Sequence, residues 1–179
     1  MKLQKLLSLV RQAVERYQMV EEGDRIAVGV SGGKDSLTLL LAMKELSGFY
    51  PRKFEVCAVS VDLGFANTDY REVRNFCEKL SVEFSLVPTQ IGQIVMEERK
   101  EKHPCALCAK LRKGALVAEA LRMGCNKIAY AHHKDDFVET MLLSLIFQGR
   151  FYAFPPVTWF EDTCLTVLRP LMFVEEAQV

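Results

Sequence analysis

Residues 31–36 read Ser-Gly-Gly-Lys-Asp-Ser, which brings two glycines, a cation, a carboxylate and two hydroxyls together. Glycine lets the backbone approach a ligand closely, and the hydroxyls and the ammonium add hydrogen-bond donors. The run before it, 25–30, is short, apolar and β-branched like a buried strand, and 37–46 consists largely of good helix formers. The pattern predicts a strand-to-helix turn whose free N–H groups bind phosphate; a Gly-Gly turn with an Asp or Ser cap is the alternative.

Two common phosphate loops do not fit this stretch. The Walker loop requires a glycine where this chain has Val28, and Ser or Thr where it has Asp35. The dinucleotide fingerprint G-x-G-x-x-G also fails, because the next glycines after Gly29 are Gly32 and Gly33. The loop therefore belongs to another class of phosphate site.

A second group of reactive side chains lies at 131–140, Ala-His-His-Lys-Asp-Asp-Phe-Val-Glu-Thr. His133, Asp135 and Asp136 fall at an expected strand end and helix start, where the helix dipole favours carboxylates. Capping accounts for one aspartate. Two carboxylates beside two histidines can also bind magnesium or steer a nucleophile.

The third group is Cys105-Ala-Leu-Cys108, whose spacing brings both sulfurs within reach of one metal or of each other. Zinc, redox dithiol and iron–sulfur sites all use this spacing. Cys57 and Cys77 lie instead within apolar strand and helix patterns, so we expect them in the core.

A basic stretch surrounds the cysteine pair, and Glu101 is the one acidic residue within it. Such a stretch is either a solvated helix face or a surface that holds RNA phosphates. Its cations are Arg99, Lys100, Lys102, Lys110, Arg112 and Lys113.

Strand and helix patterns alternate along the chain, which predicts an α/β fold with a mainly parallel sheet covered by helices on both faces. In such sheets ligands bind at the carboxyl ends of the strands, where strand order reverses. The loop at 31–36, Asp62 and the His132-His133 pair each follow a different strand, so we expect them at one edge. Expected strands are 25–30, 54–61, 82–87 and 126–131, with short candidates at 154–160 and 164–168; expected helices are 35–47, 69–80, 90–98, 106–123 and 134–148.

The bulk composition is that of one globular domain. The chain has 179 residues, half of them apolar, and 23 acidic residues balance 23 basic ones. An N-terminal amphipathic helix within 1–22 carries one apolar stripe and is interrupted by charge, so it is neither a signal peptide nor a span. We expect a cytoplasmic protein without a membrane segment, with this helix packed on a main domain of 23–179.

The loop at 31–36 resembles the SGGxDS pyrophosphatase loop of the PP-loop ATP pyrophosphatases. The resemblance implies a doubly wound, five-stranded sheet of the adenine nucleotide alpha hydrolase type, and ATP cleavage that leaves AMP on a substrate oxygen. It implies that the loop holds the departing pyrophosphate, that Val61 and Asp62 contact the nucleoside, and that His133 and Asp136 lie across the ATP site. Asp62 is equally suited to capping its own turn. The loop residues are Ser31, Gly32, Gly33, Lys34, Asp35 and Ser36, with Asp35 and Asp136 placing Mg²⁺.

The segment 104–116, followed by 131–140, resembles the tRNA 2-thiocytidine synthetase branch of that superfamily. Pro155-Pro156 and the Leu-Arg-Pro-Leu run at 168–171 resemble its next landmarks. The resemblance implies adenylation of a cytidine carbonyl in a tRNA anticodon loop, then sulfur transfer through a 4Fe–4S cluster on Cys105, Cys108 and a third cysteine. That cysteine follows the Arg-Pro-Leu landmark in the family, whereas this chain has none after Cys164. We therefore expect a truncated or disordered C-terminus with the third ligand past Val179; Cys164 as ligand, or zinc in place of the cluster, are the alternatives.

We therefore expect ATP, Mg²⁺ and the cluster as cofactors. We expect tRNA and a sulfur donor, either a cysteine desulfurase or sulfide, as partners, and a homodimer as the assembly. Two other functions stay open at this point. One is amide or amidine synthesis, as in lysidine synthetase, and the other is a zinc-stapled nucleotide-binding scaffold without catalysis.

Overall fold

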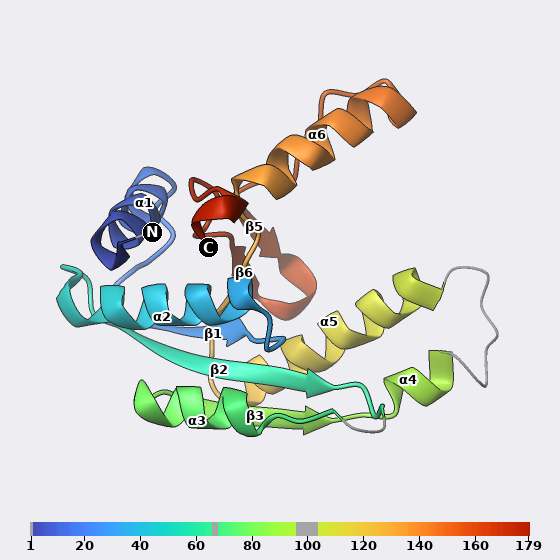
Figure 1. The fold of residues 1–179 in the computed structure, drawn as a ribbon, viewed down its shortest axis with the longest axis horizontal. Helices are drawn as coiled ribbons and strands as arrows, with labels where there is room; N and C mark the ends of the chain where they lie inside the picture. The colour runs from blue at the N-terminus through green and yellow to red at the C-terminus, as the bar shows by residue number, and fades with distance from the viewer. Residues whose placement is uncertain (1, 66–67, 96–103) are drawn as a thin grey trace.

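The computed structural model describes residues 2–65, 68–95 and 104–179. Its centre is a six-stranded sheet in the order β3-β2-β1-β4-β6-β5, parallel except for β5, which runs antiparallel to β6 (Figure 1). The strands are β1 (Asp24–Gly29), β2 (Phe54–Asp62), β3 (Glu83–Pro88), β4 (Lys127–Ala129), β5 (Val157–Phe160) and β6 (Leu165–Leu168).

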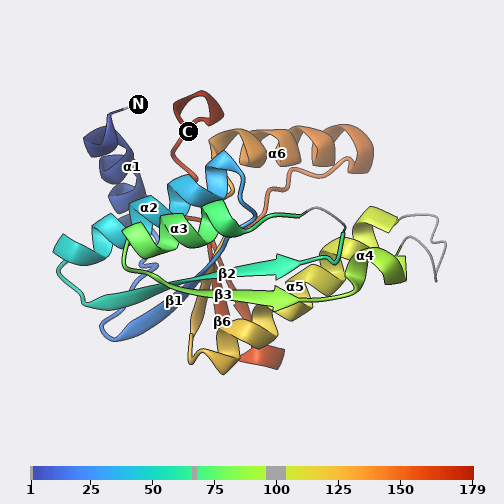
Figure 2. The same ribbon diagram turned by 60° about the horizontal axis from the view of Figure 1, so that its bottom comes forward.

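Helices connect the parallel strands and cover both faces of the sheet (Figure 2). The α-helices are α1 (Leu3–Arg16), α2 (Lys34–Phe49), α3 (Arg71–Lys79), α4 (Ile91–Gln93), α5 (Pro104–Arg122) and α6 (Lys134–Gln148). Short 3₁₀ turns are η2 (Glu161–Thr163) and η3 (Glu176–Gln178).

The predicted α/β class and the mainly parallel sheet are confirmed, but the sheet has six strands and not five. The two short candidate segments both form strands: β6 joins the parallel set beside β4, and β5 folds back on β6. A four-residue strand carries too little periodicity to be recognised with certainty from sequence, and pairing is what stabilises it. The helix expected at 90–98 is α4, and 96–98 lie outside the described residues.

Two hydrophobic clusters lie on opposite faces of the sheet. The larger joins α1, α2 and α3 to one face and includes Val10, Leu39 and Met43, all with no exposed surface. The smaller joins α5 to the other face through Leu116, Ala120 and their neighbours. The sheet is therefore buried on both sides, which explains why its central strands are continuous apolar runs rather than alternating ones.

The strand order reverses beside β1, which lies between β2 and β4. The loop after β1 and the segment after β4 consequently leave the sheet at neighbouring carboxyl ends. This is the position at which open α/β sheets bind ligands. Of the described parts of the chain, no helix is both long and apolar enough to cross a membrane.

Candidate functional site

The loop at 31–36 forms the turn from β1 into α2 and is held in shape by its own serines. The Ser36 hydroxyl donates to the Gly33 carbonyl at 2.9 Å and accepts from the Ser31 amide at 3.2 Å. Gly32 has φ +85°, a left-handed conformation that favours glycine. This geometry leaves the first-turn N–H groups of α2 free to face a ligand, as anion sites at helix N-termini require.

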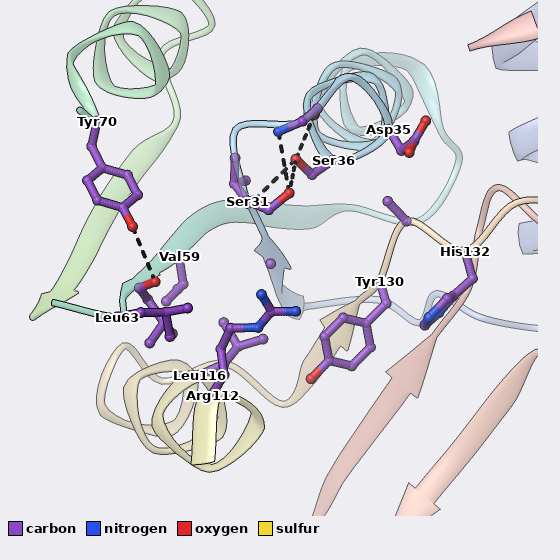
Figure 3. Close-up of a pocket in the computed structure, with 15 residues that line it drawn as sticks. Ser31, Asp35, Ser36, Val59, Leu63, Tyr70, Arg112, Leu116, Tyr130 and His132 are labelled. Carbon is purple, nitrogen blue, oxygen red and sulfur yellow. Dashed lines mark hydrogen bonds between the residues drawn. The ribbon is translucent and has the colours of Figure 1, made fainter. Parts of the chain in front are cut away.

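A cavity of about 380 Å³ opens beside this loop (Figure 3). The loop, the end of β2, α5 and the segment after β4 all contribute to its wall. Its lining includes Ser31, Gly33, Asp35, Ser36, Val59, Val61, Leu63, Tyr70, Arg112, Leu116, Tyr130 and His132. A cavity of this size, mostly apolar with a few convergent polar groups, is typical of small-molecule sites.

Glycine is also needed at the floor of this cavity, because the sheet and α5 meet there. A Cβ atom on Gly29 would lie 3.1 Å from Leu116 Cδ2 and 3.6 Å from Tyr130 Cε1. The absence of a side chain at Gly29 thus lets α5 approach the end of β1 closely.

One wall of the cavity is aromatic and carries buried polar atoms. The His132 ring lies 4.9 Å from that of Phe154, and Arg169 lies over Phe154 at 5.0 Å. Burial lowers the pKa of His132, and the nearby Arg169 charge lowers it further, so the ring is neutral at pH 7. His132 Nδ1 and the Tyr130 hydroxyl are buried and have no hydrogen-bond partner within the described chain. Polar atoms of this kind are available to a ligand.

His133 is not among the residues that line the cavity and is the N-cap residue of α6. It is buried, and its backbone N–H donates to Asp136 Oδ2 at 2.7 Å, so Asp136 caps the helix. The neighbouring Asp135 accepts from the Glu176 amide at 2.7 Å, which lowers its pKa. The second carboxylate of the pair thus holds the C-terminal turn.

On the opposite side, β2 ends at Val61 and Asp62. Val61 lines the cavity and its carbonyl accepts from the Tyr70 hydroxyl at 3.4 Å. Asp62 Oδ1 accepts from the Gly64 amide at 3.0 Å, which is the turn-capping role. Asp62 is not part of the cavity lining, whereas Leu63 is.

Cys105 and Cys108 lie in the first turn of α5, one exposed and the other half-buried. Residues three apart on a helix share a face, with about 5–6 Å between their Cβ atoms. Arg112 follows one turn later, and in Figure 3 its guanidinium reaches from α5 toward the loop at Ser31 and Ser36. The same helix therefore carries both thiols near its start and, one turn further on, a cation that lines the cavity.

A family model described as the PP-loop domain matches residues 4–179. The chain belongs to the PP-loop domain family. This confirms the resemblance that the loop at 31–36 indicated.

Two curated relatives of this PP-loop chain carry the same enzyme name. The tRNA-cytidine(32) 2-sulfurtransferase of Pelobacter propionicus is 40% identical over 176 residues, which are 98% of this chain and 65% of the relative. The enzyme of the same name from Geobacter sulfurreducens is 38% identical, over 98% of this chain and 68% of its own. The PP-loop chain thus spans about two thirds of the length of these relatives.

Solved structures agree with the fold. The U34-tRNA thiolase NcsA from Methanococcus maripaludis, solved with its 4Fe–4S cluster, superposes with a TM-score of 0.75 at 22% identity, over 98% of this chain and 60% of NcsA. The NH3-dependent NAD synthetase from Campylobacter jejuni gives 0.59 at 16% identity, over 99% of this chain and 70% of that one. At these identities the likeness concerns the PP-loop fold alone.

Of the residues predicted for the site, the PP-loop fold brings Ser31, Gly33, Asp35, Ser36 and Val61 to the cavity. Other predicted residues lie beside it or pair elsewhere. Lys34 Nζ bonds Glu176 Oε1 at 3.1 Å, and His133, Asp136 and Asp62 engage in the local contacts described above. The basic residues Arg99, Lys100 and Lys102 lie outside the described residues.

Among the polar residues that line the PP-loop cavity, sequence reasoning missed Tyr70 and Tyr130. It placed the His132-His133 pair at this edge but chose His133 as the site residue, whereas His132 lines the cavity. Arg112 was noted within the basic stretch but not as a cavity residue. His132 and His133 follow the end of β4 at Ala129, so the alternation of side chains along a strand does not decide which of them faces the cavity. No signal in the sequence says which one, because that depends on how β4 is placed between β1 and β6.

Of the remaining cysteines, the two predicted for the core are buried. Cys57 and Cys77 are buried, as expected, and Cys57 Sγ lies 3.2 Å from Cys125 Sγ in the smaller core cluster. Cys164 is exposed, in a left-handed conformation between η2 and β6. Among residues 2–65, 68–95 and 104–179, no three His, Cys, Asp or Glu side chains gather closely enough to hold a metal ion.

Proposed function

We propose that this chain carries out ATP-dependent tRNA thiolation: it adenylates a base carbonyl, releases pyrophosphate, and then supports sulfur transfer at Cys105 and Cys108. One observation carries the proposal. The helix that bears the two cysteines, α5, also lines the cavity beside the PP-loop through Arg112 and Leu116. Since a helix rises about 1.5 Å per residue, Cys108 lies about 6 Å along the axis from Arg112. The names of the curated relatives support the same activity.

In the first half-reaction, the base carbonyl oxygen attacks the α phosphorus of ATP, and the bond from that phosphorus to the bridging oxygen of the β phosphate breaks. The electron pair leaves with pyrophosphate. The free N–H groups of the loop and the Lys34 ammonium stabilise the charge that develops on this leaving group. Arg112, opposite the loop, is suited to neutralising the phosphate that stays on the base.

Asp35 suits a hard cation such as Mg²⁺, because its Oδ1 is buried without a hydrogen-bond partner in the described chain. Asp136 is the second proposed ligand, with one oxygen already accepting from His133. A bound Mg²⁺ supplies charge neutralisation at the phosphates. The role of Asp35 is to hold the ion beside the loop, and that of Ser31 and Ser36 is to keep the loop N–H groups oriented.

In the second half-reaction, a sulfur nucleophile attacks the adenylated base carbon, and AMP departs with the former carbonyl oxygen. Sulfide supplies this nucleophile directly, whereas the persulfide of a cysteine desulfurase supplies it only after two thiols reduce the persulfide to sulfide and form a disulfide with each other. Cys105 and Cys108 are accessible thiols at one end of the cavity-lining helix, which fits thiolate ligation of an iron–sulfur cluster. Such a cluster, when bound, supplies the site that carries sulfur. Amide synthesis has no use for this cysteine pair, and a zinc scaffold would release no pyrophosphate.

The test measures both half-reactions on anaerobically purified protein with tRNA, ATP and a sulfide source. Lys34→Ala and Asp35→Ala should abolish tRNA-stimulated pyrophosphate release, because the leaving group loses its cation or its magnesium ligand. A variant that keeps near-normal release would contradict the loop assignment.

Cys105→Ser/Cys108→Ser should separate the half-reactions. Adenylation needs ATP, magnesium and a bound base, so pyrophosphate release should continue while thionucleoside, measured by mass spectrometry, disappears. Cys57→Ser is the matched control. Because Cys57 is a buried core residue, the folded fraction of this variant should keep its thiolation activity. Thiolation that persists in the double serine variant would remove these cysteines from the mechanism. Iron content and the absorbance spectrum distinguish a cluster from zinc.

A further inference from the structure

A second pair of cysteines lies in the core under α5, apart from the pair in the first turn of that helix. Cys57 is on β2 and Cys125 follows the end of α5, and their Sγ atoms are 3.2 Å apart. Both belong to the smaller core cluster, with 1% and 4% of their surface exposed. The two residues are 68 positions apart in the sequence, so only the tertiary structure brings them together.

The backbone fixes the position of each thiol. Cys57 lies within β2, which pairs with β1 on one side and with β3 on the other. Cys125 follows the Schellman motif that ends α5, in which Gly124 has φ +75° and its amide donates to the Leu121 carbonyl at 2.9 Å. The Cys125 amide donates to the Ala120 carbonyl at 2.9 Å. The close approach of the two sulfurs therefore follows from the sheet and the helix end, and not from freely rotating surface side chains.

Arg25 places a positive charge beside this pair. Its terminal nitrogens donate to Glu55 and Glu83 at 2.8 and 2.5 Å, whereas its Nε is buried without a hydrogen-bond partner in the described chain. A hydrogen bond from the Cys57 thiol lowers the pKa of Cys125; burial opposes this shift and the Arg25 charge adds to it. The same hydrogen bond and burial raise the pKa of Cys57. Cys125 is therefore the more acidic thiol of the two, and the thiolate is the reactive form of cysteine.

Cys77 shows how a cysteine that only fills the core differs from this pair. It is buried in the larger cluster, and burial raises the pKa of its thiol. Buried thiols of that kind are inert. The Cys57–Cys125 pair combines a donor thiol, an acidified thiol and a neighbouring cation, which is typical of redox-active cysteines.

We propose that Cys57 and Cys125 are a dithiol that hydrogen peroxide oxidises to a disulfide, with Cys125 as the attacking thiolate. Because both thiols are buried, the oxidant has to be small, and peroxide meets this requirement. The proposal does not depend on the thiolation chemistry.

The oxidation takes two steps. The Cys125 thiolate attacks one peroxide oxygen, the O–O bond breaks, and a sulfenic acid forms while hydroxide leaves and takes up the proton that the Cys125 thiol had released. The Cys57 sulfur then attacks the sulfenic sulfur, the S–O bond breaks, and the thiol proton leaves with the hydroxyl group as water. Two electrons pass from the two sulfurs to the peroxide, and two water molecules result. The sulfurs have to approach from 3.2 Å to the bonding distance of about 2.05 Å.

The disulfide joins two elements that shape the cavity. It links β2, which ends at Val61 and Asp62, to the end of α5, the helix that carries Arg112; α5 lies against β2 in the smaller cluster (Figure 2). A cross-link over so long a stretch of sequence restricts the unfolded chain, so the oxidised protein should be the more stable form.

Peptide mapping of the unmodified, folded chain tests the proposal without any core substitution. The protein is treated with hydrogen peroxide, unfolded, alkylated and digested, and the peptides are identified by mass spectrometry. We expect a Cys57–Cys125 cross-linked peptide that a thiol reductant removes, while Cys77 remains a free, alkylated thiol. Alkylated Cys57 and Cys125 after peroxide treatment, or sulfinic acid at Cys125 without the cross-link, overturns the proposal.

The rate of cross-linking tests the role of the cation. Arg25→Gln removes the positive charge and should slow disulfide formation several-fold, because less Cys125 is present as thiolate. Glu55→Gln is the matched control: it breaks one of the ion pairs of Arg25 but keeps the guanidinium, and it should leave the rate unchanged. An unchanged rate in Arg25→Gln, or an equal loss in Glu55→Gln, overturns the assignment of Cys125 as the attacking thiolate.

Thermal unfolding of Cys105→Ser/Cys108→Ser/Cys164→Ser tests the link between the two elements, because the exposed thiols are then absent. After peroxide treatment its melting temperature should rise by about 5–10 °C, and a thiol reductant should reverse the rise. The same treatment of a chain that also carries Cys125→Ala should give no rise. A cross-linked chain that melts no higher than the reduced one overturns the stabilising role of the disulfide.

Discussion

Gly32 and Gly33 are adjacent in the nucleotide loop, yet they meet different demands. Gly32 has φ +85°, whereas Gly33 has φ −75° and ψ 157°, an ordinary extended conformation. Neither would meet a close contact on gaining a Cβ, since the nearest heavy atoms lie 3.5 Å away. Substitutions at these two positions therefore test the effect of backbone conformation separately from that of packing.

Gly32→Ala should lower the free energy of unfolding by about 1–2 kcal/mol, because an L-residue is strained in the left-handed region. Gly33→Ala should change it by less than about 0.5 kcal/mol, since alanine adopts an extended φ readily. Urea unfolding of both variants measures the difference. Equal losses would contradict the assignment of the Gly32 effect to its left-handed backbone conformation.

Buried and exposed cysteines should also differ in their effect on stability. Cys57→Ser places a hydroxyl in the smaller core cluster, beside the Cys125 thiol, and should cost about 1–3 kcal/mol. Cys105→Ser changes an exposed side chain and should cost less than about 0.5 kcal/mol. Thermal unfolding of both variants under reducing conditions makes the comparison, and equal shifts would contradict the assignment of Cys57 to the core.

At the scale of elements, α5 links the two halves of the site, and its far end is fixed to the sheet. Glu119 accepts from Arg122 Nε at 2.8 Å and from the Ser85 hydroxyl on β3. These contacts lower the pKa of Glu119 from its usual 4.5 to about 2, with the Arg122 hydrogen bond as the largest cause. The orientation of α5, and with it that of Arg112 and the cysteines, depends partly on this anchor.

The Glu119 anchor predicts a specific pH dependence. Because its folded pKa lies below the unfolded value, the stabilisation is fully present above pH 4.5 and is lost as pH falls toward 2. Glu119→Gln should therefore cost about 2 kcal/mol at pH 7 and almost nothing at pH 2. Glu45→Gln, on the exposed side of α2, is the control and should show no such convergence. Unfolding free energies across this range measure it, and parallel curves for wild type and Glu119→Gln would contradict the anchor.

At the scale of the whole molecule, the C-terminal turn η3 contacts the loop at 31–36. Glu176 pairs with Lys34 across 142 residues of sequence, and the adjacent Glu175 pairs with Lys134 at 2.8 Å. Both pairs are about half exposed, so solvent screens each of them. Of these two pairs, the one between Glu176 and Lys34 involves a residue of the loop at 31–36.

Glu176→Gln should tighten ATP binding about two- to fivefold, because the phosphates no longer compete with the Glu176 carboxylate for the Lys34 ammonium group. Glu175→Gln removes the same charge one residue away and should change the affinity much less. Calorimetric titration of ATP into each variant makes the comparison. Equal gains would indicate a general charge effect instead of competition for Lys34.

The sequence by itself determined the local elements and the motifs that they carry. The turn at 31–36, the helix start at 134 and the cysteine turn at 105–108 follow from glycine, capping carboxylates and helix formers acting over a few residues. The buried parallel sheet follows from continuous apolar strands, and it predicts that the loops after β1 and β4 meet.

Tertiary structure alone decided which side chains meet. It turned His132 into the cavity and buried His133 at the start of α6, brought Arg112 of α5 to the cavity wall, and paired Lys34 with Glu176. It also left large apolar side chains of α6 exposed, among them Leu143, Ile146 and Phe147. These outcomes depend on strand placement and helix rotation, which are set by contacts between residues tens of positions apart and leave no mark in any short stretch of sequence.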